Sequence, residues 1–163
     1  ARLNAAETRI KALDDAARAA AQQAAAEAEA ARSPTGTAAG DLAAAQGLVA
    51  GDPAGAARAY ETLIENWPDT PQAREANTRL GDVRRSGNNM AGAVTAYAAS
   101  LNGWPTTPWA GETTLKLARA LIATDRKPQA CGALGEFNRR YAASASAQLK
   151  TIAGQIRTQA RCT

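Results

Sequence analysis

The sequence predicts an all-α protein, with a long coiled-coil-type helix followed by a right-handed superhelix of about three helix pairs and a C-terminal helix. Two observations support this prediction: alanine provides 44 of the 163 residues, and a pattern of rare residues recurs every 37 positions. Alanine is the best helix former and lets helices approach closely. Histidine is absent, which excludes His-dependent triads, His-ligated zinc and His-ligated haem within this chain.

The positive charge is concentrated at the C-terminal end. The net charge of the chain is +4, and residues 126–163 carry seven basic groups and one acidic group. This segment has only Phe137 and Tyr141 as aromatic residues, both at core-like spacing, so a stacking surface for nucleic acid is not expected. We expect a solvated face or a contact with an acidic partner. No apolar run is long enough to predict a transmembrane segment.

Residues 1–32 contain no glycine or proline and predict one long helix. Apolar positions recur at heptad spacing, which is typical of a coiled coil. We therefore expect homo-oligomerisation through this helix, weakened by the small area that alanine buries. The alternatives are a helix packed on its own domain and a frayed tether. The expected interface residues are Leu3, Ala6, Ile10, Leu13 and Ala17.

A repeat of 37 residues occupies residues 38–163, after a short linker at 33–37 that contains proline and glycine. Tyr60 recurs as Tyr97, and the pair Trp67-Pro68 recurs as Trp104-Pro105. Because tryptophan and proline are rare in this chain, their recurrence at the same interval as the tyrosine is not expected by chance. The predicted units are 38–69, 70–106 and 107–143, followed by a capping helix at 144–163.

Each unit is predicted to contain two helices. Threonine followed by proline suits a helix start, and proline disfavours helix in the residue before it. The first helices are expected to begin after the caps Thr70 and Thr107 and to run to about Arg85 and Ala123. The second helices are expected to begin at Pro53 after the cap Asp52, near Met90 and near Lys127, and to end near Trp67, Trp104 and Tyr141.

A shared spacing relates the second and third units. It is carried in the second by Leu80-Gly81, Ala93, Tyr97 and Pro105, and in the third by Leu117-Ala118, Ala130 and Leu134. This spacing resembles the tetratricopeptide repeat. Gly81 and Ala93 are small where paired helices would cross closely, and Tyr97 would fill the gap beside them. The unit is three residues longer than the usual 34.

The link Trp67-Pro68-Asp69-Thr70-Pro71, behind an alanine-rich helix and with a terminal cysteine pair, resembles the periplasmic Tol–Pal-associated YbgF/CpoB family. The resemblance implies a periplasmic adaptor that forms trimers as that family does, and whose partners are TolA and, through it, the peptidoglycan synthase machinery. Its role would be to coordinate outer-membrane constriction with septal peptidoglycan synthesis during cell division. Since the chain begins at Ala1, we expect that a signal peptide has been removed or that the chain is a trimmed piece.

The two cysteines are predicted to form a disulfide. Cys131 lies near the start of the second helix of unit three, and Cys162 lies at the end of a predicted helix at 146–161. Adjacent helices of such arrays are antiparallel, which brings the two residues together. A disulfide favours an oxidising compartment. The alternatives are two unpaired buried thiols and a redox-active pair, and the latter is disfavoured because no Cys-x-x-Cys motif occurs.

The expected function is protein binding without catalysis. Paired carboxylates do not converge, and no motif for a metal or cofactor occurs. In tetratricopeptide arrays the first helices line the concave face, and Ala45 lies among the positions expected there. The expected partner-binding residues on this face are Asp41, Leu48, Glu75, Thr78, Asp82, Arg85, Glu112, Leu115, Arg119 and Ile122. The alternative function is another periplasmic repeat scaffold, resembling the lipoprotein of outer-membrane protein assembly, which would need a cysteine near its mature N-terminus.

Overall fold

The computed structural model describes the backbone of residues 2–30 and 33–162 and the side chains of residues 7–24 and 33–162. The prediction of an all-α protein is confirmed, because every regular element in these described ranges is a helix. The chain divides into two compact units, Ala1–Pro34 and Thr35–Thr163.

The first unit contains the single helix α1 (Arg2–Ala30). Its described side chains are all exposed, including Ala17, and Ile10 and Leu13 are 60% and 70% exposed. Leu3 and Ala6 lie outside the residues whose side chains are described. The two large apolar residues are thus not covered within the described part of this chain, and self-association through α1 stays a prediction.

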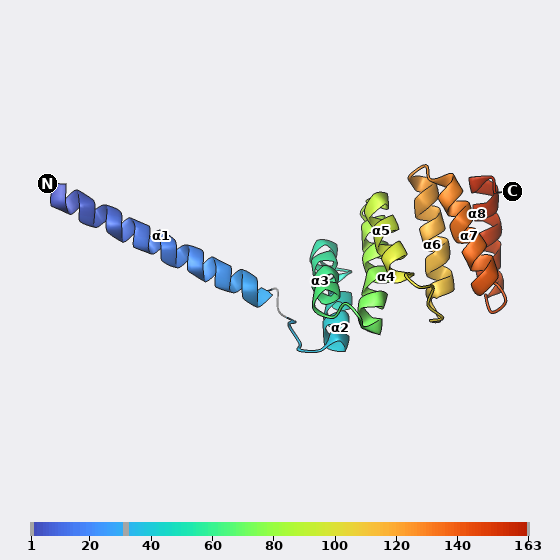
Figure 1. The fold of residues 1–163 in the computed structure, drawn as a ribbon, viewed down its shortest axis with the longest axis horizontal. Helices are drawn as coiled ribbons and strands as arrows, with labels where there is room; N and C mark the ends of the chain where they lie inside the picture. Colours follow the sequence, from blue (N-terminus) through green and yellow to red (C-terminus); the bar gives the residue numbers. More distant parts are fainter. Residues whose placement is uncertain (1, 31–32, 163) are drawn as a thin grey trace. The chain divides into compact units, whose positions relative to one another are not determined.

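The second unit is a row of helices that follow one another in chain order (Figure 1). Consecutive helices pack against each other along the whole row. Its helices are α2 (Ala38–Leu48), α3 (Pro53–Asn66), α4 (Pro71–Ser86), α5 (Met90–Ser100), α6 (Ala110–Ala123), α7 (Lys127–Arg140) and α8 (Ala147–Ala160). The helices α3, α5 and α7 begin at intervals of 37 residues, as the sequence repeat predicts.

Side-chain caps begin most helices of this row. Asp52 Oδ1 accepts a hydrogen bond of 2.8 Å from Gly55 N at the start of α3, and Thr70 Oγ1 accepts one of 3.1 Å from Ala73 N at the start of α4. Each cap is followed by a proline at the first helical position. Both predicted helix starts are therefore confirmed, and their physical basis is the pairing of backbone N–H groups that a helix leaves unbonded.

The predicted link between units two and three is wrong in two places. Helix α5 ends at Ser100, four residues before Trp104, and α6 begins at Ala110 without a side-chain cap. Gly103 and Trp104 take left-handed φ angles of 73° and 53°, so the chain turns early and the link is longer. Thr107 instead accepts a hydrogen bond of 3.0 Å from Ala110 N through its carbonyl oxygen.

Small residues permit close packing inside the second unit. Tyr97 on α5 is fully buried, and Gly81 on α4 faces its ring. A Cβ atom on Gly81 would lie 2.9 Å from Tyr97 Cζ and closer still to two other ring carbons. The prediction that Gly81 is small because helices cross closely there is confirmed.

A disulfide between Cys131 and Cys162 closes the C-terminal end of the row, which confirms the predicted pairing. Cys131 lies in α7 and Cys162 follows α8, and their Cα atoms are 5.5 Å apart. The bridge holds the last helix, which has a neighbour on one side only, against the body of the array.

Candidate functional site

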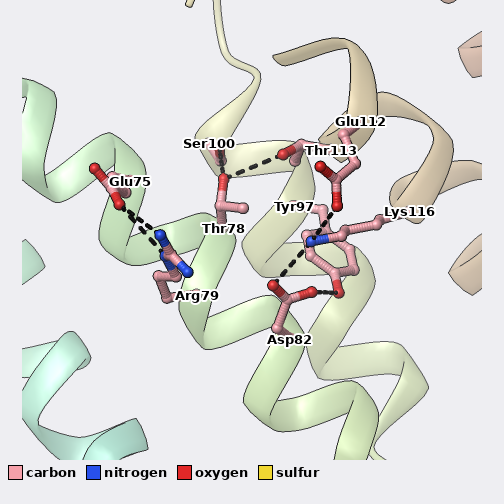
Figure 2. Close-up of polar contacts among 9 residues, drawn as sticks. All are labelled: Glu75, Thr78, Arg79, Asp82, Tyr97, Ser100, Glu112, Thr113 and Lys116. Atoms are coloured by element: carbon pink, nitrogen blue, oxygen red, sulfur yellow. Dashed lines mark hydrogen bonds and ion pairs between the residues drawn. The ribbon is translucent and has the colours of Figure 1, made fainter. Parts of the chain in front are cut away.

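A cluster of polar side chains lies where α4, α5 and α6 meet (Figure 2). At its centre the carboxylate of Asp82 accepts a hydrogen bond of 2.7 Å from the Tyr97 hydroxyl and one of 3.0 Å from Lys116 Nζ. Lys116 also forms an ion pair of 3.1 Å with Glu112, one turn earlier on α6. Burial, followed by the hydrogen bond to Asp82, raises the pKa of Tyr97. The hydroxyl therefore stays protonated and remains a donor at neutral pH.

A second, buried part of the cluster joins three hydroxyl groups. Thr78 Oγ1 lies 2.6 Å from Ser100 Oγ and 3.5 Å from Thr113 Oγ1, and the three residues come from α4, α5 and α6. All three are buried. Because paired hydroxyls satisfy one another away from water, these contacts position α6 on the preceding pair and leave nothing for a partner to bind.

The expected binding residues are divided between surface and interior. Arg85, Glu112, Arg119 and Leu48 are exposed, and Arg119 donates a hydrogen bond of 3.3 Å to Gln155 Oε1 on α8. A further group of expected binding residues is partly exposed, namely Glu75, Asp82 and Ile122. These seven side chains are available to a partner.

The expected surface placement of Asp41, Thr78 and Leu115 is wrong. They are 4%, 6% and 2% exposed. Leu115 belongs to the apolar core around α6, α7 and α8, and Ala45 is buried as well. The reason is geometric: a helix inside the array is covered on both sides by neighbouring helices, so part of the predicted face points at the next unit.

Asp41 is held in the interior by several donors. Its Oδ2 accepts a hydrogen bond of 3.0 Å from Trp67 Nε1, and its Oδ1 accepts bonds of 3.1 Å and 2.7 Å from the backbone nitrogen and hydroxyl of Thr35. A buried carboxylate needs such donors to offset its lost hydration. Asp41 thus ties the start of the array to Trp67, the residue that follows α3.

A cavity with a volume of about 870 Å³ lies between α2, α3 and α4. Apolar side chains line much of it, among them Val49, Ala57 and Val83. Tyr60, Arg79 and Arg84 add polar groups from α3 and α4. Cavities of this size with a few polar groups are typical of binding sites.

Lys116 and Arg79 were not among the expected binding residues. The signal that would have found them is the repeat itself, because they stand 37 residues apart, as do Tyr60 and Tyr97. Cations at equivalent positions beside equivalent tyrosines indicate a recurring polar contact, which spacing on one helix does not reveal.

Comparison with known families agrees with this architecture. Residues 40–70, which include most of α2 and all of α3, match the tetratricopeptide repeat family. The chain contains a tetratricopeptide repeat. No curated protein matches the chain significantly. All-helical arrays of this type are typically scaffolds for protein–protein interaction.

Among the described residues, no helix is both long and apolar enough to cross a membrane. No group of three or more Cys, Asp or Glu side chains among the described residues is arranged to hold a metal ion.

Proposed function

We propose that this protein is a non-enzymatic periplasmic adaptor of the Tol–Pal system, which coordinates outer-membrane constriction with septal peptidoglycan synthesis by binding other proteins. The observation that carries the binding role is the cavity of about 870 Å³ within an array that contains a tetratricopeptide repeat. The exposed charged side chains of Arg85 on α4 and of Glu112 and Arg119 on α6 supply further contacts for a peptide segment.

The proposed partners are TolA and, through it, the peptidoglycan synthase machinery. This assignment rests on the resemblance of the Trp67-Pro68-Asp69-Thr70-Pro71 link and its surroundings to the YbgF/CpoB family. The disulfide between Cys131 and Cys162 supports an oxidising compartment such as the periplasm.

Reversing two charges on the first-helix face tests this function. The double variant Arg85→Glu with Arg119→Glu is expected to weaken binding to TolA by roughly 30-fold, because losing a binding anchor costs about 2 kcal/mol. Both side chains are exposed, so helicity and melting temperature should change little. Titration calorimetry with purified TolA measures the affinity, and circular dichroism checks the fold.

The matched control reverses two exposed arginines of the C-terminal segment, Arg157→Glu with Arg161→Glu. We expect TolA binding to survive this change. If the control abolishes binding while the first variant binds normally, the site lies on the basic C-terminal surface. If unaltered protein does not bind TolA at all, the assignment to the Tol–Pal system fails.

We also propose that α1 forms a homo-oligomer, with a trimer suggested by the family resemblance. Ile10 and Leu13 are exposed on α1 at positions that a coiled coil would bury. Removing residues 1–32 is then expected to leave a monomer, while the whole chain gives a multiple of that mass. Light scattering at several concentrations measures both, and an equal number of chains per particle would show that α1 is no interface.

A further inference from the structure

Tyr60 on α3 carries a hydroxyl group that the described part of the chain leaves unpaired. The side chain is 0% exposed, and no described residue forms a hydrogen bond with its oxygen. Buried hydroxyls are nearly always paired, because an unpaired one loses its hydration without compensation. Tyr60 also lines the cavity between α2, α3 and α4. The cavity is therefore bordered by a residue whose hydroxyl lacks an acceptor.

The next unit shows how the same tyrosine is satisfied. Tyr97, 37 residues later, donates to Asp82 Oδ1 at 2.7 Å, and Lys116 donates to Asp82 Oδ2 at 3.0 Å. Figure 2 shows the carboxylate between the hydroxyl and the ammonium group. Lys116 has a second carboxylate beside it, that of Glu112 at 3.1 Å. One hydroxyl and one cation thus hold one carboxylate.

Unit one and the start of unit two repeat this arrangement with one part missing. The hydroxyl, the cation and the second carboxylate are all present, and Arg79 pairs with Glu75 at 3.0 Å as Lys116 pairs with Glu112. The central carboxylate is missing, because Ala45 stands at the position that corresponds to Asp82. The matching pairs are Tyr60 and Tyr97, Arg79 and Lys116, Glu75 and Glu112, and Ala45 and Asp82.

The electrostatic surroundings of Tyr60 agree with this correspondence. Burial raises the pKa of Tyr60, the charge of Arg79 lowers it, and the charges of Glu75 and Asp82 raise it. The cation and acid that correspond to Lys116 and Glu112 are therefore close enough to act on this phenol. The hydroxyl is a donor at neutral pH.

The junction of unit three with α8 shows what happens when the arrangement is not kept. Leu134 replaces the tyrosine there, and none of the charged partners remains at the matching positions. These positions are occupied by Arg119, Ala153 and Leu149. In that junction the whole set is lost together, whereas at Tyr60 the hydroxyl and cation are kept and the carboxylate alone is missing.

We propose that the cavity binds an aspartate or glutamate side chain of a protein partner, whose carboxylate lies between the hydroxyl of Tyr60 and the guanidinium of Arg79. This inference rests on the proposed binding function and names the chemistry of the partner. The cavity lining carries two cations, Arg79 and Arg84, and one acid, Asp82. Asp82 is paired with Lys116 and Arg84 with Glu61, which leaves Arg79, paired with Glu75, as the cation for an incoming acid. Val49, Ala57 and Val83 favour apolar neighbours on the bound segment.

The probe that tests this inference is a pair of acetylated and amidated peptides that differ only in a central Asp or Asn, flanked by leucine and valine. Fluorescence anisotropy measures their affinity for the full chain. The unaltered protein is expected to prefer the Asp peptide by about tenfold or more. Tyr60→Phe and Arg79→Gln are each expected to reduce that preference to about threefold or less.

Ala45→Asp offers the sharpest variant, because it places a carboxylate within the chain at the position that matches Asp82. We expect it to abolish the preference for the Asp peptide. The matched control is Tyr141→Phe, which removes a hydroxyl that donates a hydrogen bond of 2.8 Å to the carbonyl of Pro105 and does not line this cavity, so it should leave the preference unchanged. Tyr60→Phe should keep the melting temperature of the unaltered protein, which shows that the preference is not lost through unfolding.

Equal affinity of the two peptides for the unaltered protein would overturn the inference, as would a preference that survives Tyr60→Phe. A third peptide with central Asn and a free C-terminal carboxylate separates the two sources of an acid, and binding as tight as that of the Asp peptide would overturn the assignment to a side chain. If TolA binds but the Asp preference is absent, this inference fails alone. If the preference is present and TolA does not bind, the proposed function fails alone.

Discussion

Replacing both Cys131 and Cys162 with alanine is expected to lower the free energy of unfolding of the array by about 3–4 kcal/mol. The bridge joins residues 31 apart in sequence, and in the chain-entropy model a closed loop of that length restricts the unfolded chain by this amount. The corresponding fall in melting temperature is roughly 10 °C or more. Urea unfolding followed by circular dichroism measures the loss.

Reduction of the unaltered protein is the matched control, since it breaks the same bond without changing a residue. Alkylation and intact mass should first show that the native, unreduced protein has no free thiol. The expected stability of reduced protein is that of the double alanine variant. Unchanged stability in both samples would mean that α8 packs on α7 without help from the bridge.

Tyr97→Ala is expected to destabilise the array by about 3–5 kcal/mol, the usual cost of removing a large buried aromatic side chain. The ring is fully buried and lies against Gly81, so its removal opens a cavity between α4 and α5. The change also removes the donor of the 2.7 Å hydrogen bond to Asp82. Denaturant titration gives the free energy of unfolding, and an unchanged slope with denaturant shows that the transition is the same.

Tyr97→Phe separates the ring from the hydroxyl. It keeps the packing on Gly81 and removes only the hydrogen bond, so we expect a loss of about 1–2 kcal/mol. Asp82 keeps its ion pair with Lys116 in this variant, which limits the cost. Equal losses for the alanine and phenylalanine variants would contradict the view that ring packing is the larger contribution.

Some features of the array follow from short stretches of sequence. Asp52-Pro53 and Thr70-Pro71 start helices because a side-chain acceptor and a preset φ angle act within one turn. The same local signal misplaced the start of α6. There Gly103 and Trp104 adopt left-handed angles, which lengthens the link and leaves Thr107 outside the cap position.

The candidate site could be predicted only in part, because burial depends on the neighbouring helix. Helical spacing correctly put Arg85, Glu112 and Arg119 on the surface. It could not show that Thr78 is covered by Ser100 and Thr113, which come from two other helices. Sequence spacing on one helix records which residues share a side, but not which element lies against that side.

The amino-acid sequence was enough to predict the helical class, the 37-residue interval, the pairing of the two cysteines and the small residue at Gly81. The helical class follows from local propensity. The other three features follow from which residue types stand at which positions of the repeat. Two features became visible only in the folded chain: Asp82 joins Tyr97 to Lys116 across three helices, and Tyr60 borders a cavity without a described acceptor. The physical reason is that hydrogen bonding and burial arise between side chains distant in sequence, where the packing of whole helices sets the distances.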